Sequence, residues 1–206
     1  MAIWAIVPVK PLKRAKSRLA TVLSADQREA LSRNLLVHTL QVLRDIDELE
    51  RTVVVSRDPA ALHLAREYDA YTLAESGSPE LNLTLQRATD MAKAFNARSV
   101  LVLATDLPMI SRADIRAMFA AAPGTGPAVV VAPDRDAAGT NALFVRPAGL
   151  LQYHFGRDSV RLHVEHAEDA GARVTVCKRV GLQMDIHGPA DLKSLPPVIG
   201  APFLLN

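Results

Sequence analysis

The chain has 206 residues, of which 49% are hydrophobic and 22% charged, so it is long enough for one globular domain with a full core. The formal net charge of +2 gives no reason to expect a nucleic acid or a membrane surface as a partner. A single cysteine excludes an internal disulfide and a cysteine-rich zinc site, and we expect a cytoplasmic protein. No apolar run approaches the ~20 residues that span a bilayer.

Strand and helix patterns alternate along the chain. The predicted strands cover residues 3–9, 52–56, 99–104, 128–132, 141–145 and 173–177. The predicted helices cover residues 25–45, 60–67, 81–95, 112–121, 158–170 and 189–195, with Ser24, Ser111 and Ser159 as candidate caps and a loop at 75–79. This alternation predicts an α/β sandwich with a mostly parallel sheet, in one domain over residues 1–206.

Three polar loops follow strands of the predicted sheet. They are a basic loop over residues 10–18, the turn at Asp106 and the loop over residues 134–141. In parallel α/β sheets, ligands bind beyond the carboxyl ends of the strands. Because all three loops are expected at that edge, they predict one shared binding site.

The basic loop carries five cationic side chains within nine residues, which are Lys10, Lys13, Arg14, Lys16 and Arg18. A solvated surface loop is the simpler interpretation. However, lysine and arginine are the side chains that neutralise phosphate groups, and the loop directly follows a buried strand. We therefore favour the binding of a triphosphate. Neither a Walker-type nor a dinucleotide-binding glycine motif is present.

Two aspartates are candidate metal ligands. Asp106 follows an apolar strand and either forms part of a turn or binds Mg²⁺, which often takes only one or two protein carboxylates beside substrate phosphates. Asp185 would complete such a site if the fold brings it to Asp106, and otherwise it caps the last helix. His187 is more often a surface histidine than a metal ligand.

Two further stretches offer groups that bind anions. Gly139 and Thr140 can present backbone amides and a hydroxyl, whereas Asp134 and Arg135 are expected to pair on the surface. The N-terminus of the helix near Ser159 is a second candidate anion site. Two anion sites indicate two phosphorylated ligands, a nucleotide and an acceptor.

Six motifs then occur in order over nearly the whole chain: VPVKPLKRAKSRL, ELNLTL, ATDLPMI, PDRDAAGTNAL, FGRDSVRLH and MDIHGPADL. As a set they resemble the guanylyltransferases that activate 2-phospho-L-lactate, phosphoenolpyruvate or 3-phosphoglycerate for the deazaflavin coenzyme F-420. The resemblance implies a glycosyltransferase-A-like nucleotidyltransferase fold, a three-layer sandwich with a mixed, mainly parallel sheet. It also implies that GMP passes from GTP to the acid, with Mg²⁺ as cofactor and pyrophosphate as the second product.

The resemblance also assigns roles to residues of this chain. Lys16 and Asp106 would be catalytic, and Asp106 and Asp185 would hold Mg²⁺. The nucleotide would be bound by Lys10, Lys13, Arg14, Arg18 and Asn82, and the acceptor by Thr140, Gly156 and Ser159. The chain departs from the family pattern at His187, where a second acidic residue is usual, and at Glu80, where a glycine is common.

Three alternatives stay open. A cytidylyl- or sugar-nucleotidyltransferase would share the fold, and so would a glycosyltransferase, although the latter normally keeps an Asp-X-Asp pair that the turn at Asp106 lacks. His187 keeps an inactive nucleotide-binding module open, whereas Asp106 and the basic loop argue against it. The sequence leaves the identity of the acid and the oligomeric state undetermined, and a homodimer is the common case.

Overall fold

The computed structural model describes residues 2–77, 80–122 and 124–200, and the chain folds around one seven-stranded sheet. The strand order is β3-β2-β1-β4-β6-β5-β7. The strands are β1 (Ile3–Pro8), β2 (Leu49–Ser56), β3 (Tyr71–Ala74), β4 (Ser99–Leu103), β5 (Ala128–Pro133), β6 (Thr140–Arg146) and β7 (Arg173–Val176). Strand β6 pairs antiparallel with β4 and β5, while the other pairings are parallel. The mixed, mainly parallel sheet is confirmed.

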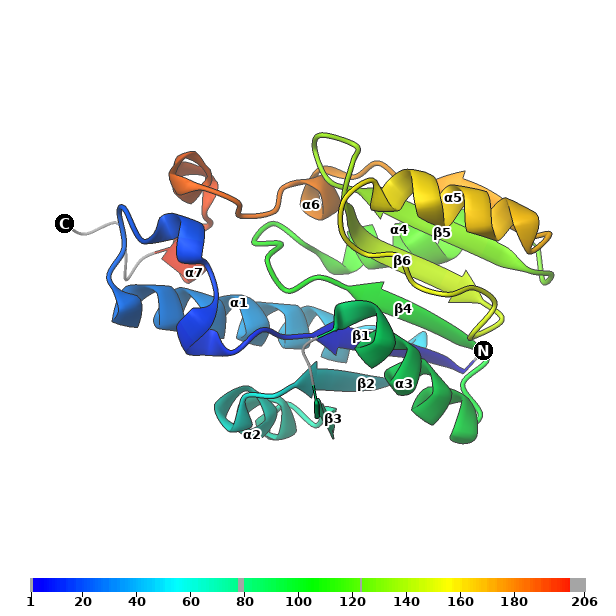
Figure 1. The fold of residues 1–206 in the computed structure, drawn as a ribbon, viewed down its shortest axis with the longest axis horizontal. Helices are drawn as coiled ribbons and strands as arrows, with labels where there is room; N and C mark the ends of the chain where they lie inside the picture. Colours follow the sequence, from blue (N-terminus) through cyan, green and yellow to red (C-terminus); the bar gives the residue numbers. More distant parts are fainter. Residues whose placement is uncertain (1, 78–79, 123, 201–206) are drawn as a thin grey trace.

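Helices cover both faces of this sheet. They are α1 (Ala25–Arg44), α2 (Pro59–Glu67), α3 (Leu81–Ala94), α4 (Arg112–Ala121), α5 (Ser159–Asp169) and the short α6 (Val180–Gln183) and α7 (Pro197–Gly200). Three 3₁₀ turns are η1 (Leu12–Arg14), η2 (Ser17–Leu19) and η3 (Pro189–Ser194). Figure 1 shows α3 and α5 in front of the sheet and α4 behind it. No helix within the described ranges is both long and apolar enough to cross a membrane.

The two faces of β1 explain the three layers. Successive strand residues point to opposite faces of a sheet. Ala5 and Val7 pack in one hydrophobic cluster with α1, α2 and α4, whereas Trp4 and Ile6 pack in a second cluster with α3 and α5. All four side chains are fully buried. Strands that are apolar on both faces therefore lie in the middle of the sandwich, as the pattern predicts.

A third, smaller cluster lies at the other end of α1. It joins Leu19 at the end of the basic loop and Leu31 of α1 to Ile186 and Leu195 near the C-terminus. Figure 1 shows the C-terminal segment, in orange and red, beside the basic loop, in blue. The cluster therefore holds the segment that contains Asp185 against the basic loop, although the two are far apart in sequence.

Most predicted elements match the observed ones within a few residues, and both Ser24 and Ser111 form the expected capping boxes. The cap at Ser159 is wrong, because Asp158 is the N-cap of α5 and Ser159 bonds elsewhere. The sequence analysis missed β3, which has only four residues at the edge of the sheet, and α6, which has four as well. Residues 78–79 of the predicted loop, and residues 201–206, lie outside the described residues.

Candidate active site

The register of the sheet brings the predicted loops to one edge. Leu103, the last residue of β4, pairs with Ala142 of the antiparallel β6, so β6 begins where β4 ends. Pro133, the last residue of β5, pairs with Thr140. The loops that follow β1, β4, β5 and β7 therefore meet at the carboxyl edge of the parallel strands, as the sequence analysis expected.

Lys16 connects three of these segments. Its Nζ donates to Asp106 Oδ2 at 3.0 Å and to the carbonyl oxygen of Ile186 at 2.9 Å. The Ile186 amide in turn donates to the Asp106 carbonyl at 3.0 Å. Lys16 has a left-handed backbone, with φ 57°, which is uncommon for a residue with a side chain and is found often at functional sites. The Lys16 side chain thus contacts Asp106, and only 12% of it is exposed.

Asp185 lies close enough to Asp106 for their charges to interact. Burial, and then the charge of Asp106, raise the pKa of the Asp185 carboxyl, while His187 acts in the opposite direction. The Asp185 side chain is 5% exposed and that of Asp106 is 35% exposed. The structure therefore brings the two predicted metal ligands together. Asp185 does not cap the helix predicted over residues 189–195, because that segment is the 3₁₀ turn η3 and Gly188 is its N-cap.

His187 lies between Arg18 and Asp185. Arg18 Nη1 is 3.4 Å from His187 Nδ1, and His187 Nε2 contacts the Asp185 carboxylate. Because arginine only donates hydrogen bonds, Nδ1 accepts and Nε2 carries the hydrogen toward Asp185. A pocket of about 260 Å³ opens here, lined by Asp134, Arg135, Asp136, Asp185 and His187.

The expected surface pair of Asp134 and Arg135 is wrong. Asp134 closes its own turn by accepting the amides of Ala138 and Gly139, at 3.0 and 2.8 Å. Arg135 instead donates to Asp191 Oδ1 at 2.6 Å and to the Asp185 carbonyl at 3.1 Å. Since Asp191 is distant in sequence, neighbouring residues alone could not reveal this pair. Arg135 thus holds the backbone of Asp185, the residue with the buried carboxylate.

Asn141 is a buried residue that the sequence analysis missed. Its side-chain nitrogen donates to the Leu182 carbonyl at 2.9 Å, and its own carbonyl accepts the Ala104 amide at 2.9 Å. Ala104 is two residues before Asp106, and Leu182 is three before Asp185. Asn141 therefore links the two segments that carry the carboxylates. A signal was present in the sequence, because a polar residue that opens an apolar strand needs a partner.

Thr140 and Ser159 lie in contact on the other side of the site. The Thr140 amide donates to Ser159 Oγ at 2.8 Å, and Ser159 Oγ donates to Thr140 Oγ1 at 3.1 Å. Because the Gly139 amide is bonded to Asp134, neither predicted backbone amide is available to an anion, and that expectation is wrong. The Thr140 hydroxyl also meets His163 Nδ1 at 3.1 Å, a partner that the sequence analysis missed.

The loop before α5 holds Gly156 and contacts Asn82. Gly156 has φ 134°, which disfavours any other residue, and the space around its Cα is open. The Asn82 side chain bonds the backbone of Phe155 twice, accepting its amide at 2.7 Å and donating to its carbonyl at 3.2 Å. The structure thus places Asn82 against the loop expected to bind the acceptor, and its contact with the nucleotide stays a prediction.

The remaining cations of the basic loop, Lys10, Lys13 and Arg14, are exposed. The loop that carries them is anchored by Asp58, which accepts the Leu12 amide at 2.7 Å and the Ala60 amide at 2.9 Å. One carboxylate therefore caps α2 and holds the basic loop at the same time. Asp58 is partly buried and precedes a proline at the start of α2, a sequence pattern that indicates a helix cap. Its second role, as anchor of the basic loop, is visible only in the structure.

Comparison with known proteins gives a consistent family assignment. Residues 3–196 match the sequence model of a family described as guanylyl transferase CofC like. A phosphoenolpyruvate guanylyltransferase of Rubrobacter xylanophilus is 40% identical over 195 residues, which cover 95% of this chain and 94% of the relative. A 2-phospho-L-lactate guanylyltransferase of Methanothermobacter thermautotrophicus is 32% identical over 193 residues, covering 93% of this chain and 83% of the relative.

Solved structures agree on the fold. A putative nucleotide-diphospho-sugar transferase from Desulfovibrio desulfuricans has a TM-score of 0.69 at 17% identity, covering 86% of this chain and 80% of its own. A 4-diphosphocytidyl-2C-methyl-D-erythritol synthase has a TM-score of 0.64 at 13% identity, with 93% and 96% covered. At these identities the likeness shows the fold alone, and the nucleotidyltransferase sandwich expected from the sequence is confirmed.

Asp58→Ala should loosen the basic loop. We expect the dissociation constant for GTP to rise about tenfold and the free energy of unfolding to fall by about 1–2 kcal/mol, since a cap and a loop anchor are both lost. Calorimetric titration and urea unfolding measure the two effects. Ser24→Ala is the control, because it removes a cap of α1 and should destabilise by about 1 kcal/mol without changing GTP binding. Equal GTP binding by D58A and the wild type would contradict the anchoring role.

His163 should make the fold sensitive to acid. Burial, and next the charges of His154 and His166, lower the pKa of His163 to about 4, from 6.5 for an unperturbed histidine. The unfolded chain therefore binds more protons between these values, and stability falls by up to about 3 kcal/mol as the pH drops from about 6.5 to about 4. In H163N the plot of unfolding free energy against pH should be flatter by about one proton over this range. Identical slopes for both proteins would refute the assignment.

Proposed function

Since the chain belongs to the CofC-like guanylyl transferase family, we propose that it transfers GMP from GTP to a three-carbon phosphoacid in the biosynthesis of coenzyme F-420, with release of pyrophosphate. The observation that carries the proposal is the junction of Lys16, Asp106 and Asp185 at the carboxyl edge of the sheet. We propose phosphoenolpyruvate as the acid, because relatives of 34–40% identity carry that name.

The proposed reaction is an in-line displacement. An oxygen of the acceptor's phosphate forms a bond to the α-phosphorus of GTP, the bond between the α-phosphorus and its bridging oxygen breaks, and pyrophosphate leaves with that electron pair. A strong base is unnecessary, because the attacking phosphate is already ionised at neutral pH. The barrier comes from bringing two anions together, so the chain's task is to position them and to offset their charge.

The basic loop supplies the positive charge for the triphosphate. Lys16 is held near the carboxylates by its contact with Asp106, and Arg18 extends from the same loop toward His187. Lys10, Lys13 and Arg14 stay exposed and free to meet phosphate oxygens. On the acceptor side, the Thr140 hydroxyl and the open backbone at Gly156 would receive the phosphoacid, and Ser159 would hold that hydroxyl through its own hydrogen bond.

Asp106 and Asp185 fit a Mg²⁺ ion. They are hard oxygen donors from two segments, and a cation between them would offset both the burial of Asp185 and the charge of Asp106, which together raise the pKa of Asp185. Two carboxylates match the share of ligands that Mg²⁺ often takes from a protein when it also binds substrate phosphates. When bound, the ion would supply positive charge to the triphosphate. His187 would orient Asp185 rather than bind the metal, because its Nε2 hydrogen faces that carboxylate.

Two further expectations belong to this proposal. A cytoplasmic location is supported by the single cysteine, Cys177, which is buried and free. A homodimer is expected from the frequency of two-fold oligomers alone.

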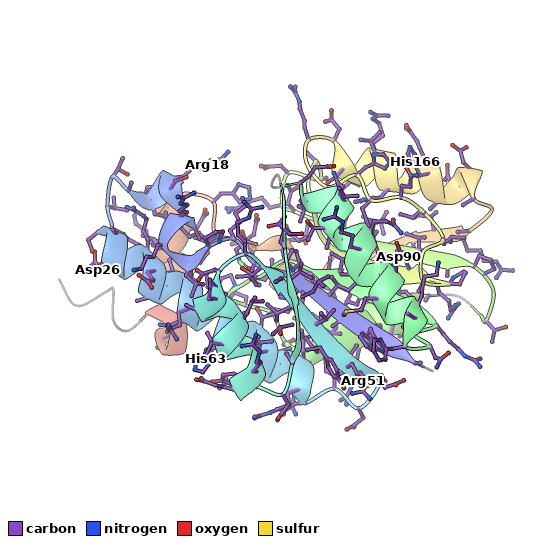
Figure 2. All side chains as sticks on the ribbon, turned by 60° about the horizontal axis from the view of Figure 1, so that its bottom comes forward. Arg18, Asp26, Arg51, His63, Asp90 and His166 are labelled. Carbon is purple, nitrogen blue, oxygen red and sulfur yellow. The ribbon has the colours of Figure 1, made fainter. Side chains whose placement is uncertain are left out.

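Asp106→Asn should lower kcat by at least about 100-fold, because it removes one charge from the proposed ion site at the reacting phosphates. The midpoint of thermal unfolding should change little, because the lost ion pair with Lys16 is offset by removal of the charge that acts on Asp185, and asparagine keeps an oxygen for the Lys16 hydrogen bond. Asp90→Asn removes an exposed carboxylate from α3 and controls for the change in charge (Figure 2). Undiminished turnover by D106N at limiting Mg²⁺ would rule out the metal role.

The proposed function is tested by measuring pyrophosphate release with Mg²⁺ and GTP against phosphoenolpyruvate, 2-phospho-L-lactate and 3-phosphoglycerate, with ATP and CTP as controls. We expect release with GTP and phosphoenolpyruvate. Release with CTP instead would indicate a cytidylyltransferase, and no release by folded protein that binds GTP would indicate an inactive binding module.

A further inference from the structure

A buried chain of hydrogen bonds runs from the loop before α5 to the Thr140 hydroxyl. The His154 amide donates to His163 Nε2 at 3.1 Å, and His163 Nδ1 lies 3.1 Å from Thr140 Oγ1. Ser159 Oγ donates to the same Thr140 oxygen at 3.1 Å. His163 and Ser159 are fully buried, and Thr140 is 8% exposed.

The directions of the two His163 bonds follow from the first one. A backbone amide can only donate, so His163 Nε2 accepts and carries no hydrogen. A neutral imidazole has its single hydrogen on the other nitrogen, which places it on Nδ1. Nδ1 therefore donates to Thr140 Oγ1. The environment of the ring keeps it neutral, because burial and the neighbouring His154 and His166 all lower its pKa.

The Thr140 oxygen is then saturated as an acceptor. A hydroxyl has two acceptor positions and one donor, and His163 and Ser159 occupy both acceptor positions. Within residues 2–77, 80–122 and 124–200, no protein atom accepts the hydrogen of this hydroxyl. The Thr140 hydroxyl therefore offers a ligand one donor, its hydrogen, and the two hydrogen bonds that it accepts polarise this donor.

We propose that His163 is a positioning residue of the acceptor site, which holds the Thr140 hydroxyl as a hydrogen-bond donor and so selects an ionised phosphate or carboxylate oxygen. A ligand that presents an N–H or O–H donor to Thr140 finds no acceptor there. This inference rests on the proposed function, because it assigns the ligand class of the acceptor side of that same site. It adds a residue that does not itself touch the substrate.

Which nitrogen of His163 carries the hydrogen is measured directly by nuclear magnetic resonance of ¹⁵N-labelled imidazole nitrogens in the wild-type protein. We expect the His163 hydrogen on Nδ1 and an unprotonated Nε2 at pH 7.5, with and without phosphoenolpyruvate. A hydrogen on Nε2 would overturn the proposal, whatever the activity of the enzyme. This measurement needs no variant, so it stands even where a substitution prevents folding.

Kinetics of three variants test the effect on the acceptor. H163L removes the donor to Thr140, and its KM for phosphoenolpyruvate should rise about tenfold, as for one lost hydrogen bond, with the KM for GTP unchanged. H163N keeps an N–H at the position of Nδ1, because its side-chain nitrogen is the same number of bonds from Cα, and should restore the KM to within about threefold. T140V combined with H163L should be no worse than T140V alone, since His163 acts through that hydroxyl.

Thr39→Val is the matched control, because Thr39 is also fully buried but its hydroxyl donates to the Leu35 carbonyl of its own helix. It should leave both KM values unchanged. Equal KM values for H163L and the wild type would overturn the role of His163 and leave guanylyl transfer intact. If the wild type binds phosphoenolpyruvate in a calorimetric titration but releases no pyrophosphate, the proposed function is wrong. Weaker binding by H163L than by the wild type would then still support the role of His163, and equal binding would overturn it.

Discussion

The burial of the Asp185 carboxyl group, near the charge of Asp106, is the constraint on which the architecture of this site depends. A carboxylate that is almost fully buried and feels the charge of a second one destabilises the fold unless positive charge or hydrogen bonds offset it. Lys16 supplies an ammonium group to Asp106, and His187 supplies an N–H to Asp185. Lys16 and His187 would be displaced, or would share the carboxylates, when a cation and a triphosphate bind. In the free protein they therefore take the place of the positive charge that the proposed ligands would bring.

The rest of the fold supplies the rigid frame for this contact. Asn141 joins the segments before the two aspartates, and Arg135 with Asp191 braces the backbone at Asp185. The cluster of Leu19, Leu31 and Ile186 holds the C-terminal segment beside the basic loop. These contacts are buried or charge-assisted, which restricts motion more than exposed pairs would. Positioning, rather than acid–base chemistry, is what the proposed reaction requires of the chain.

The acceptor side of the site differs from the side with the two aspartates, because its groups are neutral. Thr140, Ser159 and His163 form a network into which two backbone amides donate, that of His154 to His163 and that of Thr140 to Ser159. A neutral network can be buried at lower cost than a charge, and it still presents a donor to an anion. The site therefore has one half suited to a triphosphate and one suited to a smaller anion.

The sequence by itself determined the alternation of strands and helices, the caps at Ser24 and Ser111, and the family motifs, because each of these depends on residues close together in the chain. It also placed Lys16, Asp106 and Thr140 near one edge, since strand ends of a parallel sheet share it. Only the tertiary structure decided that Arg135 pairs with Asp191, that Asn141 bonds Leu182, and that His163 sets the direction of the Thr140 hydroxyl. The two residues of each pair are 23 or more residues apart in sequence, and the periodicity of neighbouring residues carries no information about contacts at such separations.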